Sequence, residues 1–252
     1  MAELLVQDPQ GYAAALQQHL KAWRNAEQAG PMEAYMRGQF PFLGIRSPQL
    51  KALLRDWTTS NGVPQGEALR ETVRVLWRQP EREMQYAAMG LLEKRRKEAG
   101  IGDLPLLEEL VVTKPWWDTV DLLASHIAGS ILAKHPESVP ESADMWISSG
   151  HLWLQRTALL YQLGYKERTD AERLFRYTRQ CSGSTEFFIR KAIGWALREY
   201  SKTDEAAVRA FVASTPLSPL SVREALKAAD RNRKDGEGLE SAPEGRMIRE
   251  ER

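Results

Sequence analysis

The chain has 252 residues, 42% of them hydrophobic, and a net charge of +1 from 35 Lys and Arg against 34 Asp and Glu. It is long enough to bury a sizeable core, and its charge alone neither indicates nor excludes a nucleic-acid partner. No stretch approaches the roughly 18 apolar residues that span a membrane. The first ten residues carry two acidic residues and no basic one, so we expect no secretory signal. The single cysteine, Cys181, fits a reducing cytoplasm, and we expect an inert thiol.

Helical periodicity runs through the chain, and signals for strands are nearly absent. Apolar residues recur at every third or fourth position, and most breaks fall near Gly or Pro. The predicted helices, in chain order, cover residues 12–27 (ending at Gly30-Pro31), 47–57, 69–78, 82–97, 104–112, a run from 116 to 134, 142–149, 152–165, 169–179, 186–200, 204–214 and 222–229. The sequence therefore predicts an all-α fold.

The helices repeat with a period of 35 residues. Four stretches align at this spacing, each at the head of the second helix of a pair: Met84–Ala88, Thr119–Leu123, Leu154–Ala158 and Ile189–Ile193. This repeat of helix pairs indicates a helical solenoid of the HEAT kind, although the period is a little short for that class, and in such folds the second helices usually line one concave wall. We expect one HEAT-like repeat domain over residues 1–229 with a concave, basic cleft. Residues 230–252 are polar and mixed in charge, which predicts a disordered tail.

The period makes Asp121, Arg156 and Lys191 equivalent positions. Charges inside apolar runs of a solenoid usually face outward, and on the second helices these are Arg156, Arg190, Lys191 and Arg198. Two interpretations are open. The charges belong to an ordinary solvated helix face, or they form a wall that binds phosphates. The second is favoured by the interleaved aromatic residues Trp117, Tyr161 and Trp195.

Two adjacent tryptophans, Trp116 and Trp117, start a predicted helix, with Pro115 as a first-turn residue. Trp117 and Asp121 are four residues apart, so they share one helix face. An aromatic ring beside a carboxylate suits a positively charged transition state. The structural alternative is that Trp117 belongs to the core and Asp121 caps a helix or pairs with a cation.

Other catalytic chemistries have little support. The four histidines are not paired at metal-ligand spacing, and neither a glycine-rich phosphate loop nor a nucleophile elbow occurs. We therefore expect no metal and no cofactor, and a reaction that needs only side chains and water.

The chain from Tyr12 to Lys227 resembles the AlkD-type DNA alkylation repair enzymes, which are HEAT-like DNA glycosylases. The resemblance rests on five blocks in the same order: Phe40–Pro48, Trp116–Asp121, Trp153–Arg156, Phe188–Tyr200 and Leu217–Leu226. Carried over by position, it implies Asp121 as the catalytic carboxylate, and Trp117 and Trp195 as the two aromatic residues of the cleft. No position departs from the family's pattern.

The resemblance also implies DNA-binding residues. Arg156 is expected to hold a backbone phosphate, and Tyr35 is expected at the mouth of the site. Arg190, Lys191 and Arg198, which the 35-residue register places on the second helices, are expected to add phosphate contacts.

The implied substrate is double-stranded DNA with purines alkylated at N3 or N7, whose positive charge makes the base a good leaving group. We expect hydrolysis of the N-glycosidic bond without base flipping, by a monomer that is cytoplasmic and associates with the nucleoid when bound to DNA, with no membrane partner. Two alternatives stay open: a non-catalytic helical-repeat module that binds damaged or branched DNA, and a protein–protein scaffold.

Overall fold

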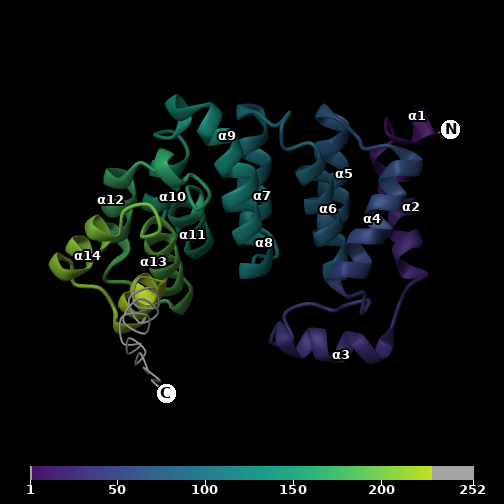
Figure 1. Ribbon diagram of the computed structural model, residues 1–252. Coiled ribbons are helices and arrows are strands. Elements are labelled where there is room, and N and C mark those ends of the chain that lie inside the picture. The colour runs from purple at the N-terminus through teal and green to yellow at the C-terminus, as the bar shows by residue number, and fades with distance from the viewer. Residues whose placement is uncertain (1, 229–252) are drawn as a thin grey trace, which may run out of the picture. The chain divides into compact units, whose positions relative to one another are not determined.

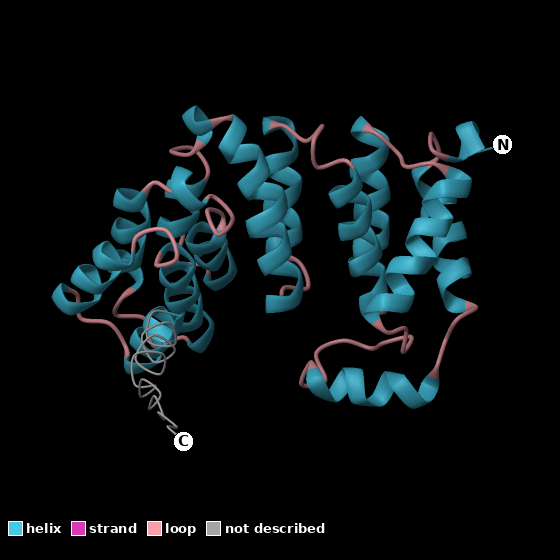
Figure 2. Ribbon diagram, in the orientation of Figure 1, coloured by secondary structure: helices cyan, strands magenta, loops and turns pink. Residues whose placement is uncertain are grey.

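The computed structural model describes residues 2–228, and all regular secondary structure in this range is helical (Figures 1 and 2). The prediction of an all-α helical-repeat fold is confirmed. No helix among the described residues is long and apolar enough to cross a membrane. The predicted tail, residues 230–252, lies outside the described part of the chain.

The described chain falls into two compact units, which meet in sequence at Gly164 and Tyr165. The prediction of one domain over residues 1–229 did not include this division. The first unit contains α1 (Ala2–Leu5), α2 (Pro9–Lys21), α3 (Ala26–Tyr35), α4 (Ser47–Asn61), α5 (Gly66–Arg78), α6 (Arg82–Lys94), η1 (Ile101–Asp103), α7 (Leu104–Val112), α8 (Trp117–Leu122), η2 (Leu123–Ala128), α9 (Gly129–Lys134), η3 (Pro136–Ser138), α10 (Ala143–Ser148) and α11 (Leu152–Leu160). The second contains η4 (Lys166–Arg168), α12 (Ala171–Cys181), α13 (Phe187–Tyr200), α14 (Glu205–Ser214) and a helix over residues 219–228.

The helix starts follow the 35-residue period. The residues that precede α4, α6, α8, α11 and α13 are Arg46, Glu81, Trp116, His151 and Glu186, and each is 35 residues after the one before. All five have extended backbone angles, and none caps its helix with a side-chain hydrogen bond. The repeat therefore begins one period earlier than the aligned stretches indicated.

Helix α5 buries the apolar face that its sequence pattern predicts. On α5, Val73 and Leu76 are fully buried at helical spacing, and Leu69 is 8% exposed. Cys181, at the end of α12, is also buried, and burial raises the pKa of its thiol to about 11. This supports the expected inert thiol, because the reactive form is the thiolate.

The prediction of one helix over residues 12–27, ending at Gly30-Pro31, is wrong. The chain breaks after Lys21 at the end of α2, and α3 then runs through Gly30 and Pro31. The reason is Asn25, whose side-chain oxygen accepts from the backbone N–H groups of the next helix's first turn. In Figure 1, α3 runs across the ends of α4 and α6 rather than alongside them.

The run from residue 116 to 134 is not one regular α-helix. Between α8 and α9 lies the π-helical segment η2, which the sequence analysis did not predict. The Ser125 hydroxyl donates to the backbone carbonyl of Asp121 at 2.6 Å, within this change of winding. Where the run meets α11, a Cβ on Gly129 would lie 2.3 Å from the carbonyl oxygen of Tyr161, so only glycine permits this approach. π-Helical turns often occur beside functional sites.

The segment between α3 and α4 is held by a buried carboxylate. Glu83 of α6 is fully buried, and its two oxygens accept from the backbone N–H groups of Leu43, Gly44 and Ile45 at 2.9–3.0 Å. Gly44 has a φ of +88°, and a Cβ there would lie 2.0 Å from the carbonyl oxygen of Asn25. Glycine is thus required at this position by both conformation and space.

We expect Gly44→Ala to destabilise the first unit much more than Gly38→Ala. Gly38 also has a positive φ, +69°, but nothing lies within 4 Å of the added Cβ, so its cost is about 1 kcal/mol of strain. At Gly44 the added Cβ also clashes with the backbone, and we expect Gly44→Ala to lower the free energy of unfolding by at least about 3 kcal/mol. Urea unfolding of both variants measures the difference; equal losses would contradict the close packing of this segment.

Candidate functional site

Helix α8 presents an aromatic side chain and a carboxylate on one face. Trp116 is the N-cap and Trp117 the first helical residue, so Pro115 lies before the helix rather than in its first turn. Trp117 and Asp121 are four residues apart and share a face. Tyr35, at the end of α3, meets the Trp117 ring edge-on with centroids 6.0 Å apart, and 69% of its surface is exposed. The predicted neighbours Tyr35, Trp117 and Asp121 therefore come together in the first unit.

A small apolar cluster holds this aromatic group in place. Its buried core comes from α3 and the segment after it: Ala29, Met36 and Phe42. The partly buried side chains packed against it come from these same parts and from two further ones, α6 and the start of α8: Met32, Phe40, Tyr86, Trp116 and Trp117. The position of α3 thus depends on the tryptophan pair, which explains why a helix that runs across the others stays attached there.

Asp121 forms a bidentate ion pair with Arg156 of α11, one 35-residue period later. Arg156 Nε donates to Asp121 Oδ1 at 2.6 Å, and Nη2 donates to Oδ2 at 2.7 Å. The Arg156 side chain is 4% exposed and that of Asp121 12% exposed. Two parallel charge-assisted hydrogen bonds fix the carboxylate plane as well as its position.

Two opposing effects set the protonation of Asp121. Burial raises the pKa of the Asp121 carboxyl above its usual range, and the Arg156 guanidinium opposes that rise. The charge of Asp118, one turn earlier on α8, adds a smaller upward contribution to the same pKa. Because Arg156 donates to both oxygens, its two hydrogen bonds favour the ionised form of Asp121.

The structure places Arg156 differently from the outward-facing position that the sequence pattern indicated. The side chain is nearly fully buried in the pair with Asp121, so that expectation is wrong for this residue. Tyr161, expected among the interleaved aromatic residues, is likewise only 2% exposed. The predicted phosphate contact of Arg156 stays a prediction, and the position seen here assigns the side chain to holding the carboxylate.

Sequence reasoning missed a second bidentate pair beside the first. Arg82 of α6 donates to Asp118, through Nε to Oδ2 at 2.9 Å and through Nη2 to Oδ1 at 2.7 Å. Arg82 is fully buried and Asp118 is 7% exposed. The available signal was the spacing: Arg82 and Asp118 are 36 residues apart, close to one period, on successive second helices.

The remaining predicted residues belong to the second unit, on α13. Trp195 is partly buried there, and Arg190 donates through Nε to a nearby backbone carbonyl. Lys191 and Arg198 both pair with Glu224, at 2.9 and 3.0 Å. The cations beside Glu224 lower the pKa of its carboxyl. The roles of these four α13 residues stay predictions, that of Trp195 from the resemblance and those of Arg190, Lys191 and Arg198 from the charge pattern of the second helices.

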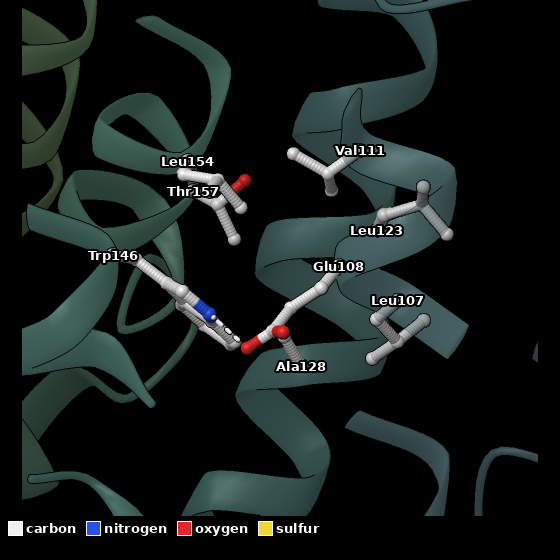
Figure 3. Close-up of a pocket in the computed structure, with 8 residues that line it drawn as sticks. All are labelled: Leu107, Glu108, Val111, Leu123, Ala128, Trp146, Leu154 and Thr157. Carbon is white, nitrogen blue, oxygen red and sulfur yellow. Dashed lines mark hydrogen bonds between the residues drawn. The ribbon is translucent and has the colours of Figure 1, made fainter. Parts of the chain in front are cut away.

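A narrow, mostly apolar pocket lies between α7, η2, α10 and α11 (Figure 3). Its lining residues are Leu107, Glu108, Val111, Leu123, Ala128, Trp146, Leu154 and Thr157. Inside it Trp146 Nε1 donates to Glu108 Oε1 at 2.6 Å. None of the predicted site residues lines this pocket; Trp117 and Asp121 lie on α8, and Tyr35 lies at the end of α3.

Comparison with known proteins agrees with this fold. The family model described as DNA alkylation repair enzyme matches residues 16–228. A solved structure described as "Predicted DNA alkylation repair enzyme from Enterococcus faecalis" is 34% identical, with a TM-score of 0.76, and the match covers 81% of this chain and 95% of that one. Comparison with curated proteins gives no match.

Fold and comparisons together define an all-α helical-repeat protein of DNA repair. The chain belongs to the DNA alkylation repair enzyme family, which confirms the resemblance found in the sequence and supports a role in alkylation repair.

We expect Asp121 and Arg156 to be strongly coupled in stability. Asp121→Asn and Arg156→Gln should each cost about 3–5 kcal/mol of unfolding free energy, since each leaves a buried partner without its counter-charge. The double variant should cost less than the sum, with a coupling of about 2–3 kcal/mol. Urea unfolding of the four proteins measures it.

The matched control is the pair Asp103–Arg70, in which the oxygen and nitrogen are 3.0 Å apart and both side chains are about a quarter exposed. Its coupling should stay below about 1 kcal/mol because water screens it. Similar couplings for the two pairs would contradict the buried, ionised state of Asp121.

Proposed function

We propose that this protein is a DNA glycosylase that hydrolyses the N-glycosidic bond of N3- and N7-alkylated purines in duplex DNA. The observation that supports the proposal most directly is the Asp121 carboxylate, fixed by Arg156 on the helix face it shares with Trp117. A permanently cationic base leaves with the bonding electrons and becomes neutral, so no strong general acid is needed. Water adds to the C1′ atom of the sugar, and its proton passes to solvent.

Asp121 has the properties that a developing oxocarbenium ion requires. Among the described residues, its carboxylate accepts two hydrogen bonds, both from Arg156, and a carboxylate can accept about four. The remaining lone pairs can orient a water molecule and face the cationic sugar. A charge already held in place does not have to reorganise during the reaction, and such preorganised groups each contribute about 3 kcal/mol or more.

Trp117 and Tyr35 supply the aromatic side of this site. The face of an indole ring attracts a cation by about 0.5–2 kcal/mol, a smaller contribution than that of the carboxylate. Tyr35 is largely exposed beside Trp117, which supports a contact with DNA rather than a role in the core. Trp195 would be the second aromatic residue, an assignment that comes from the resemblance alone.

We further propose that the base is not flipped into a pocket. The supporting observation is that Trp117 and Asp121 on α8 and Tyr35 on α3 do not line the narrow pocket of Figure 3. Enzymes that extrude a base normally enclose it in a fitted cavity. The second candidate function, a non-catalytic module that binds damaged or branched DNA, would use the same aromatic residues, Tyr35 and Trp117, without releasing a base.

The first test uses duplex DNA that contains 7-methylguanine. We expect wild type to release free 7-methylguanine and Asp121→Asn to be about 100- to 1,000-fold slower, because the preorganised charge is lost. Asp103→Asn is the control, since it removes a paired carboxylate outside the site. Single-turnover assays, with circular dichroism of each variant, measure the rates.

Release at equal rates by wild type and Asp121→Asn would remove Asp121 from the mechanism. DNA binding by folded wild type without any base release would favour the non-catalytic module. Absence of salt-sensitive DNA binding would favour the protein–protein scaffold.

The second test varies the size of the alkyl group. A cavity that encloses the base discriminates by roughly 10- to 200-fold for each group that does not fit. Without such a cavity, excision of a bulky N7-alkylguanine should stay within about tenfold of 7-methylguanine. Matched duplexes that differ only in the adduct give the ratio, and a steep fall with adduct size would exclude the unflipped mode.

A further inference from the structure

Asp118 and Asp121 lie one turn apart on α8, and each is bound at both oxygens by an arginine from a neighbouring second helix. Residues three apart on a helix have Cβ atoms about 5–6 Å from each other. Both side chains are mostly buried, at 7% and 12% exposure. Any change in the charge of Asp118 is therefore felt at Asp121 with little screening by water.

Arg82 ties three parts of the chain to Asp118. Beyond the carboxylate, its Nη1 donates to the backbone carbonyl of Lys114 at 2.9 Å, and its Nη2 donates to the Thr119 hydroxyl at 3.0 Å. Its guanidinium also lies over the Phe40 ring, 3.8 Å from the centroid. One buried cation thus holds the connection before α8, the first turn of α8 and the segment that follows α3.

Tyr86 completes the group from the same helix as Arg82. Its hydroxyl donates to Asp118 Oδ2 at 2.7 Å, the oxygen that also accepts from Arg82 Nε. Its ring packs against the apolar cluster that includes Trp117. The residue lies 35 positions before Asp121, which makes it the equivalent position in the preceding repeat.

We propose that Tyr86 and Asp118 are positioning residues for Asp121 and Trp117. The Tyr86 hydroxyl fixes the Asp118 carboxylate and withdraws part of its negative charge, and the Asp118–Arg82 pair fixes the turn of α8 from which both site residues extend. The inference rests on the proposed glycosylase function for its effect on rate, but not for its effect on Asp121 itself.

The direction of the electrostatic effect follows from the groups around Asp121. Arg156 faces the Asp121 carboxylate from α11, and Asp118 lies on the same helix as Asp121. Arg82 and Tyr86, both on α6, act on Asp121 through their hydrogen bonds to Asp118. On η2, His126 lies instead toward Glu93 of α6, with 3.5 Å between Nδ1 and Oε2. Without the Tyr86 hydroxyl, Asp118 exerts its full charge on Asp121 and raises the pKa of that carboxyl. Asp121 is then protonated at a higher pH than in wild type.

The test compares Tyr86→Phe with Tyr12→Phe. The control also loses one hydroxyl hydrogen bond, the 2.8 Å bond from Tyr12 to the carbonyl oxygen of Gly62, on a helix that carries no site residue. The first readout is the titration of the Asp121 side-chain carboxyl by ¹³C NMR, assigned with Asp121→Asn. We expect its midpoint to move to higher pH in Tyr86→Phe and to stay in place in Tyr12→Phe.

The second readout is the single-turnover release of 7-methylguanine across pH. For Tyr86→Phe we expect an acid limb displaced to higher pH, with a rate about threefold lower on that limb, which corresponds to about half a pH unit. The DNA affinity of Tyr86→Phe should equal that of wild type, since neither Tyr86 nor Asp118 is assigned to DNA contact.

An Asp121 titration identical in Tyr86→Phe and wild type would overturn the inference, whatever the enzyme does to DNA. A shifted titration together with no base release by wild type would support the positioning role and reject the glycosylase proposal. A loss of rate equal in the two tyrosine variants would also overturn the inference, because it would reflect only a general loss of stability.

Discussion

The bidentate pair between Asp121 and Arg156 is the interaction on which the candidate site depends. It joins two second helices one period apart and fixes both the position and the plane of the carboxylate. A guanidinium at this distance cancels part of the negative charge, but burial leaves the remaining field little screened. Arg156 therefore weakens the net negative charge at Asp121 but holds its carboxylate in a fixed orientation. A fixed orientation is an advantage for a group that must be in place before a cation develops.

The same period explains why the pairs lie where they do. Because second helices begin every 35 residues, side chains one period apart sit at equivalent levels on neighbouring helices. Arg82 reaches Asp118 and Asp121 reaches Arg156 across successive steps of the repeat. In the second unit, Glu224 pairs with Lys191 and Arg198 in a similar way. Ion pairs between consecutive second helices thus recur along the chain, and the candidate site contains one of them, Asp121–Arg156.

Local signals were sufficient to predict much of this molecule. The period follows from the spacing between successive helices. Most helix bounds, and the shared face of Trp117 and Asp121, follow from the residue pattern along a single helix. Asn25, a side chain suited to capping, indicates the break before α3. The apolar pattern continues through this break, however, and led to the prediction of one continuous helix. The π-helical segment and the burial of Arg156 could not be predicted in this way. Both depend on contacts with other helices, such as the approach of Gly129 to Tyr161.

The two aspartates of α8 show how position, rather than residue type, separates structural from chemical roles. Asp118 accepts three hydrogen bonds, two from Arg82 and one from Tyr86, so most of its acceptor capacity is used within the fold. The Asp121 carboxylate accepts two from a single partner among the described residues, and it is the more exposed of the two carboxylates. The carboxylate with capacity left is the one that shares a face with Trp117. A reaction centred on Asp121 therefore requires Asp118 to stay engaged, because a second unsatisfied carboxylate one turn away would favour protonation of the first.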